Sequence, residues 1–124
     1  MTSGWIGVDL DGTLAYYHGW SEGEIGPPIP AMVQRVKDWL SHGIEVRIFT
    51  ARVGLSGDYS AESRRSADSS FAAEQRALIE KWCEDHIGAR LPVTASKDFA
   101  MIELWDDRAI QVLPNSGYRV DGCE

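Results

Sequence analysis

The chain has 124 residues, of which 44% are hydrophobic and 25% charged, an ordinary composition for one compact globular domain. Its net charge of −7, from 19 acidic and 12 basic residues, argues against strong binding to a nucleic-acid backbone. The two cysteines lie far apart, and no apolar run is long enough to cross a membrane. Because the N-terminus also lacks a signal-peptide pattern, we expect one cytoplasmic domain over residues 1–124.

The first predicted element is a buried strand over residues 5–10, a short apolar run followed by glycine. It ends in Asp9 and Asp11, with Gly12 and Thr13 directly after them. Because side chains alternate along a strand, two aspartates two residues apart can face one site at its carboxyl end. Like charges held there repel, so the pattern indicates that a cation, a proton or a phosphoryl group lies between them.

The middle of the chain alternates between loops and regular elements. Residues 15–26 place aromatic side chains among glycines, which favours a flap or a small hairpin. A helix is predicted to begin at Pro30 and to end before Gly43, because apolar residues recur every three or four positions. Residues 44–50 predict a second strand, and the polar residues 53–70 predict a surface loop.

The second half of the chain continues the same alternation. A helix is predicted over residues 71–86, followed by short strands over 91–95 and 101–105. Residues 109–113 are a candidate for a further strand. Strands that alternate with helices predict an α/β domain, a three-layer Rossmann-like arrangement around a mostly parallel sheet.

Acidic residues fall at the carboxyl ends of the predicted strands, where parallel sheets bind their ligands. Asp9 and Asp106 hold such positions, and each has a second aspartate close by in the sequence. Several negative charges in one small volume need a compensating cation. Mg²⁺ suits them, since it binds oxygen ligands and shares them with substrate phosphates. The predicted metal ligands are Asp9, Asp11, Asp106 and Asp107.

Neighbouring residues can bind a phosphate at the same edge. The Thr50 hydroxyl can donate a hydrogen bond to it, and Lys97 offers a point charge. Arg52 can contact a second phosphate or an acidic group of the substrate. One carboxylate can then attack the phosphoryl group. The predicted substrate-binding residues are Thr50, Ala51, Arg52 and Lys97.

Four segments, in this order, resemble the motifs of the haloacid dehalogenase superfamily. Residues 9–13 (DLDGT) resemble its DxDGT signature, residues 49–52 (FTAR) its threonine motif, Lys97 its lysine motif, and residues 105–108 (WDDR) its closing acidic motif. The resemblance covers about residues 5–112, and the ordered set is far more specific than DxDGT alone. Lys97 precedes Asp106 by only nine residues, a short interval for many members of the superfamily.

The resemblance implies a mechanism and a set of roles. Asp9 would be the nucleophile that forms an aspartyl-phosphate, and Asp11 would protonate the leaving oxygen and then activate water. Asp9, the backbone carbonyl of Asp11, and Asp106 would bind Mg²⁺. Asp107 would bind the metal through water or orient Lys97. The implied catalytic residues are Asp9, Asp11, Thr50 and Lys97.

The chain also resembles a capless member, because the gaps that hold cap modules in this superfamily are short here. An open site suits a large, even macromolecular, phosphate ester, unless a partner subunit or the chain's own loops cover it. We therefore expect a small Mg²⁺-dependent phosphatase, and a homo-oligomer remains open.

Three other functions are weighed against this expectation. A nucleotide or polynucleotide-end phosphatase is favoured by the flap residues Tyr16, Tyr17 and Trp20 and disfavoured by the net charge. A phospho-acceptor signalling module is disfavoured by the order of the motifs, since Thr50 holds the middle position. The third alternative is a non-catalytic phosphate-binding domain.

Overall fold

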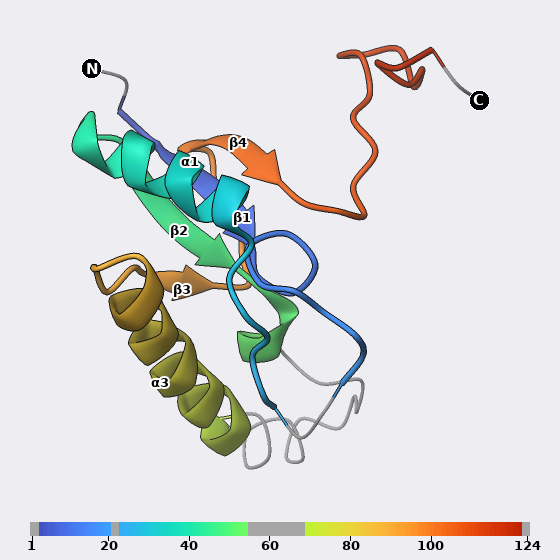
Figure 1. Cartoon of the computed structure of the whole chain (residues 1–124). Helices are drawn as coiled ribbons and strands as arrows, with labels where there is room; N and C mark the ends of the chain where they lie inside the picture. The colour runs from blue at the N-terminus through green and yellow to red at the C-terminus, as the bar shows by residue number, and fades with distance from the viewer. Residues whose placement is uncertain (1–2, 21–22, 55–68, 123–124) are drawn as a thin grey trace.

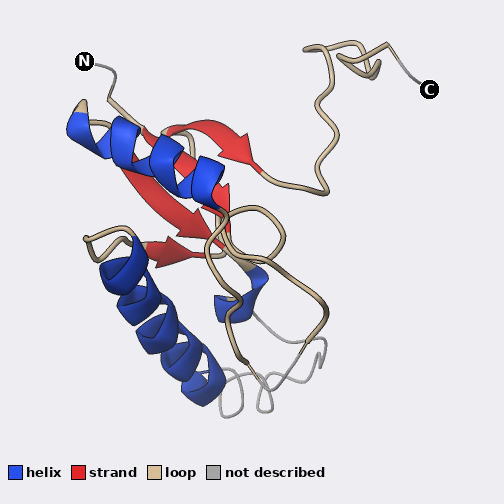
Figure 2. Ribbon diagram, in the orientation of Figure 1, coloured by secondary structure: helices blue, strands red, loops and turns tan. Residues whose placement is uncertain are grey.

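The structure is a computed structural model that describes residues 3–20, 23–54 and 69–122. Its elements are β1 (Trp5–Asp9), α1 (Pro30–Ser41), β2 (Glu45–Phe49), the 3-10 turn η1 (Ala51–Val53), α3 (Ser69–His86), β3 (Val93–Thr94) and β4 (Met101–Trp105) (Figure 1). The strands form a parallel sheet in the order β3-β2-β1-β4 (Figure 2). This arrangement confirms the predicted α/β class with a Rossmann-like sheet.

Strand β1 lies between β2 and β4, and its position explains its composition. Its first four residues are buried, as expected for a strand with neighbours on both edges and a parallel sheet around it. Gly7 fits because the added Cβ of any other residue would lie 3.0 Å from the Met101 side chain and 3.1 Å from Trp5. The central strand therefore holds its two carboxylates at the end of a closely packed scaffold.

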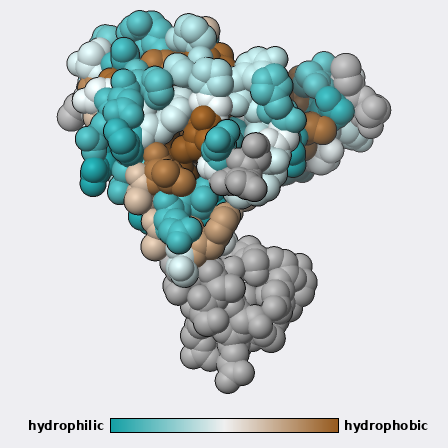
Figure 3. All heavy atoms as spheres, turned by 60° about the horizontal axis from the view of Figure 1, so that its bottom comes forward, coloured by the Kyte–Doolittle hydropathy of each residue, from teal (hydrophilic) through white to brown (hydrophobic). Residues whose placement is uncertain are grey.

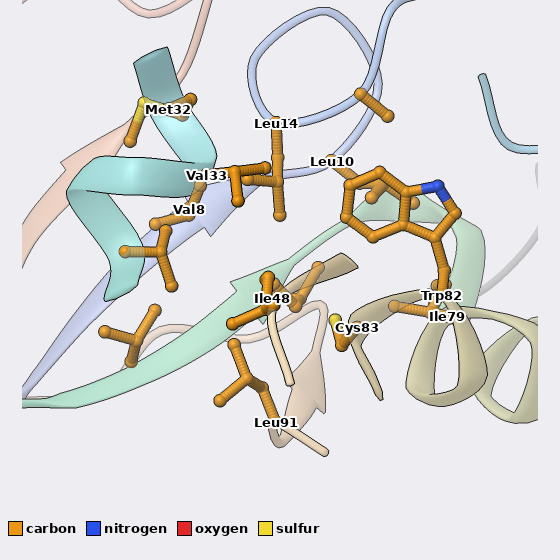
Figure 4. Close-up of a cluster of buried hydrophobic side chains, with 14 of the residues drawn as sticks. Val8, Leu10, Leu14, Met32, Val33, Ile48, Ile79, Trp82, Cys83 and Leu91 are labelled. Atoms are coloured by element: carbon orange, nitrogen blue, oxygen red, sulfur yellow. The ribbon is translucent and has the colours of Figure 1, made fainter. Parts of the chain in front are cut away.

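Both long helices contribute to one hydrophobic core. Val8 and Ile48 from the sheet belong to the same cluster as Val36 of α1 and Ile79 of α3. Figure 4 shows side chains of this cluster pointing into a common interior, among them Ile48. Burial of the apolar faces of α1 and α3 against the sheet supplies the main stabilisation of the fold.

Most predicted elements are confirmed, with small differences in their bounds. Helix α1 begins at Pro30 and ends at Ser41, and Gly43 follows with φ of +76°. Helix α3 and strands β2 and β4 also lie where the sequence predicted them. Strand β3 is shorter than predicted, because only Val93 and Thr94 pair with β2. The predicted loop 53–70 lies mostly outside the described residues.

The predicted flap is a loop closed at its base by backbone hydrogen bonds. The amide of Tyr16 donates to the carbonyl of Pro27 at 2.8 Å, and that of Ile29 donates to Leu14 at 2.8 Å. Ala15 forms an isolated antiparallel bridge with Pro28. The described part of this loop contains no strand pair, so it is a flap rather than a hairpin.

The prediction of a further strand at residues 109–113 is wrong. After β4 the chain leaves the body of the molecule, and in Figure 3 it projects to the right with hydrophobic atoms on its surface. Its main regular contact is an isolated bridge between Val112 and Arg119. An alternating apolar pattern needs a neighbouring strand to become a strand, and this segment has none beside it among the described residues. None of the described helices is long and apolar enough to span a membrane.

Core packing at Ile48 gives a prediction for stability. Ile48 is fully buried, so Ile48→Ala should lower the free energy of unfolding by about 2–4 kcal/mol through lost burial and the cavity left behind. Denaturant unfolding measures the change. Ile102→Ala is the matched control, because Ile102 lies on β4 and is 44% exposed, and it should cost about 0.5 kcal/mol. Equal losses in the two variants would contradict this account of the core.

Candidate functional site

Three carboxylates meet at the carboxyl ends of β1 and β4. The parallel register pairs Val8 with Trp105, so the next residues along the two strands, Asp9 and Asp106, lie side by side. With Asp107 they form a group in which each residue offers an oxygen within 4.8 Å of the others. We call these three residues the acidic cluster.

Burial and the neighbouring carboxylates raise the pKa of Asp9 from its ordinary value of 3.8 to about 7. Burial is the largest cause, followed by a hydrogen bond with Asp107 and by the charges of Asp106, Asp107 and Asp11. Among the described residues none of the three cluster members forms an ion pair with a cationic side chain. An all-oxygen group with this excess of negative charge fits a hard divalent cation such as Mg²⁺.

The turn after β1 is shaped so that Asp107 can approach it. Gly12 has φ of +91°, and a Cβ there would lie 2.5 Å from the Asp107 carboxylate. The Thr13 hydroxyl lies 3.4 Å from Oδ2 of Asp9 and from Oδ1 of Asp107, so it makes weak hydrogen bonds to both. Three residues of the DxDGT sequence thus contribute to the acidic cluster. Asp9 is a member, Gly12 leaves room for Asp107, and Thr13 bonds both carboxylates.

The second aspartate of the motif has a different environment. Both oxygens of Asp11 accept hydrogen bonds from Arg52, Oδ2 from Nε at 2.7 Å and Oδ1 from Nη2 at 2.8 Å. The carboxylate of Asp11 is therefore paired with a guanidinium rather than with the acidic cluster. Its predicted role as a metal ligand depends on its backbone carbonyl.

Arg52 was expected to contact the substrate in an open site, but its side chain is buried. It is 6% exposed, because the 3-10 turn η1 directs it under the flap and toward Asp11. Thr50 is also buried and caps this turn, since its hydroxyl oxygen accepts from the Arg52 amide at 3.2 Å. Ala51, between them, is exposed and lines the site.

An open cavity of about 280 Å³ lies beside the acidic cluster. It is lined by Asp9, Asp11, Tyr17, Phe49, Ala51, Asp106 and Arg108. Phe49 and Arg108 were not predicted as site residues, whereas Tyr17 was considered for binding a nucleobase. The sequence signals for Phe49 and Arg108 were their positions directly before Thr50 and directly after the closing acidic pair.

The structure does not bring Lys97 to this cavity. Its exposed side chain lines a separate hollow with Phe99 and Met101, and it forms no hydrogen bond or ion pair with other described residues. The next residue, Asp98, accepts a hydrogen bond from the indole of Trp5, at the opposite end of β1 from Asp9. The short interval before Asp106 explains this placement, because the chain must return to the start of β4 within a few residues.

Comparison with known proteins supports the fold. No protein-family model matches the sequence, and no curated protein matches it either. The fold is similar to the solved structure of a conserved protein from Bacteroides thetaiotaomicron, with a TM-score of 0.59 and 18% sequence identity. The match covers 92% of this chain and 84% of the other. At this identity the likeness shows a shared fold.

The raised pKa of Asp9 predicts how the stability of the metal-free protein depends on pH. Between pH 3.8 and about 7, the folded chain keeps a proton on Asp9 that the unfolded chain releases. The free energy of unfolding should therefore fall as pH rises through this window. Asp9→Asn stays neutral, so it should gain about 1–2 kcal/mol on the wild type across the window, after allowing for solvent screening.

Urea unfolding in a chelating buffer at several pH values measures this difference. Subtracting the wild-type free energy of unfolding from that of the variant at each pH removes the contribution of carboxylates that both proteins share. Identical pH dependence in the two proteins would show that Asp9 does not carry the charge repulsion of the cluster.

Proposed function

We propose that the protein is a Mg²⁺-dependent phosphohydrolase that acts through an aspartyl-phosphate on Asp9. The observation that carries this proposal is the meeting of Asp9, Asp106 and Asp107 beside an open cavity. The resemblance of four ordered motifs to the haloacid dehalogenase superfamily supports it from the sequence.

The residues present suit the proposed cation and its chemistry. Asp9, Asp106 and Asp107 would hold Mg²⁺, which would neutralise and orient the phosphoryl group when bound. Asp9 would offer one carboxylate oxygen to the cation and use the other as the nucleophile, so Asp9 must be deprotonated before attack. Such a group is a poor nucleophile while it is protonated, so a cation that displaces the proton favours the reaction.

We assign roles in the reaction to two further side chains that line the cavity, Asp11 and Arg108. Asp11 lines the cavity and is the candidate for proton transfer, first to the leaving oxygen and then from water. Arg108 lines the same cavity and supplies a positive charge that can face the phosphate. Thr50 acts from a buried position through the turn that it caps. We propose Arg108 as the cationic phosphate-binding residue, because Lys97 lies at a separate hollow and the Arg52 guanidinium is bonded inside the protein.

Removal of the nucleophile is the direct test of this function. Asp9→Asn should lose phosphatase activity about 10³-fold or more, because the amide cannot form the aspartyl-phosphate. Activity of the wild type should also disappear in a chelator and return with Mg²⁺. Hydrolysis of an aryl phosphate, followed by absorbance, measures both effects.

A matched control separates this loss from a general effect of charge. Asp38 lies on the exposed face of α1 and accepts a hydrogen bond from Gln34 at 3.0 Å. Asp38→Asn should keep wild-type activity. Full activity in Asp9→Asn would refute covalent catalysis by this residue.

A nucleotide or polynucleotide-end phosphatase is the second candidate, favoured by one observation. Tyr17 is 41% exposed and lines the cavity with Phe49, so an aromatic ring stands beside the proposed phosphate position. Aromatic side chains bind nucleobases by stacking without the need for a basic surface. A terminal or free nucleotide would therefore suit this site better than an extended nucleic-acid backbone.

Tyr17→Ala tests the second candidate. Loss of one stacking ring should raise KM for nucleoside monophosphates about tenfold and leave KM for a small alkyl phosphate almost unchanged. Steady-state kinetics on the two substrates measures the difference. Tyr118→Ala, which removes an exposed ring from the C-terminal segment, should change neither value. An equal change of KM for both substrates in Tyr17→Ala would argue against nucleobase binding.

A further inference from the structure

The guanidinium of Arg52 is the most completely bonded polar group at the site. Two of its N–H groups donate to Asp11, and the others donate to the Gly23 carbonyl at 2.7 Å, to Gln75 Oε1 at 2.7 Å and to the Glu24 carbonyl at 3.0 Å. A guanidinium has five N–H donors, so all of them are used inside the protein. None is left to bind a substrate phosphate.

These bonds join four parts of the chain that are far apart in sequence. Arg52 follows β2, Asp11 follows β1, Gly23 and Glu24 belong to the flap, and Gln75 lies on α3. Gln75 is 4% exposed and is one of the few polar residues buried in the described structure. The indole of Trp20, also in the flap, lies 4.9 Å from the Arg52 guanidinium carbon. A shift of the flap would therefore move the Arg52 guanidinium and, with it, the Asp11 carboxylate.

We propose that Arg52 is a positioning residue that fixes the orientation of the Asp11 carboxylate and couples it to the flap. The two-bond fork occupies one lone-pair position on each oxygen of Asp11, and a carboxylate has about four such positions. Asp11 also lines the cavity and 21% of its side chain is exposed, so its remaining positions are accessible to a bound molecule there. The fork thus holds the proton-transfer group at a fixed angle to the reacting phosphate.

The geometry of the fork matters as well as its charge. A lysine at position 52 would keep a positive charge but has neither the planar fork nor five fixed donors. It would also leave the carbonyls of Gly23 and Glu24 without their present partner. Arg52→Lys therefore removes the orientation of Asp11 and the link to the flap while it retains one cation.

This inference rests on the proposed function, since it assigns Asp11 to proton transfer. Its kinetic test compares substrates whose leaving groups need that proton to different extents. The leaving oxygen of an alkyl phosphate must be protonated as it departs. A nitrophenyl phosphate needs this proton much less, because nitrophenolate is a stable leaving group. We expect Arg52→Lys to lose at least about tenfold more kcat/KM on the alkyl phosphate than on the nitrophenyl phosphate. A purely structural defect would lower both rates equally.

A double-mutant cycle identifies the group through which Arg52 acts. In the Asp11→Asn background, Arg52→Lys should cause little further loss on the alkyl phosphate, because the group that it orients is already disabled. Equal losses on the two substrates, or losses that multiply in the double variant, would overturn the proposal.

Two further variants keep this test decisive if Arg52→Lys folds poorly. Gln75→Leu removes one acceptor from the guanidinium and leaves Arg52 in place, so it should show the same substrate-selective loss with a smaller size. Arg47→Lys is the matched control. Arg47 lies on β2, pairs with Glu45 at 2.7 Å and stacks on Trp5, but it does not contact Asp11. Its substitution should change the two rates equally or not at all.

A crystal structure of Arg52→Lys gives a readout that does not depend on activity. We expect the Asp11 carboxylate to rotate and the backbone at Gly23 and Glu24 to shift. An unchanged Asp11 and flap would overturn the positioning role of Arg52. If the wild type hydrolyses no phosphate ester, the proposed function fails. The orientation of Asp11 in the crystal structure of Arg52→Lys still decides whether Arg52 positions that carboxylate.

Discussion

Charge repulsion at the carboxyl edge of the sheet is the constraint on which the site depends. Parallel pairing of β1 with β4 places Asp9 beside Asp106, and the turn at Gly12 lets Asp107 approach them. Strand β1 cannot shift by one residue without moving its buried side chains Ile6 and Val8 out of the core, so its register holds Asp9 beside Asp106. Burial, together with this repulsion, raises the pKa of Asp9.

The two aspartates of the DxDGT sequence, Asp9 and Asp11, have opposite electrostatic environments. Asp11 is compensated by a buried guanidinium, which is itself fully hydrogen-bonded and shielded by Trp20. Among the described residues, the polar side chains that interact with Asp9 are other carboxylates and the weak hydroxyl donor of Thr13. A buried charge is tolerated when it is paired and bonded, whereas an unpaired cluster stores repulsion that a cation or proton can relieve. This contrast matches the two different roles that we propose for Asp9 and Asp11.

The flap contacts both Arg52, the partner of Asp11, and the cavity beside Asp9. Backbone hydrogen bonds from Tyr16 and Ile29 close its base, and Arg52 holds its far side through Gly23 and Glu24. Tyr17 consequently stands at the rim of the cavity without a separate domain to carry it. The same short segment of chain thus lines the cavity through Tyr17 and contacts the Asp11 partner Arg52 through Gly23 and Glu24.

Local patterns were enough to predict the regular elements and the residues at the strand ends. The continuous apolar run before Asp9 indicates a buried strand, and the three-to-four spacing after Pro30 indicates a helix with one buried face. The contacts between distant segments depend on how the chain folds. Residues 109–113 alternate like a strand but have no strand beside them among the described residues, and the path into β4 keeps Lys97 away from the acidic cluster. Arg52 finds its partners at Asp11, 41 positions away, and at Gln75, 23 positions away, and no local periodicity encodes contacts made across such separations.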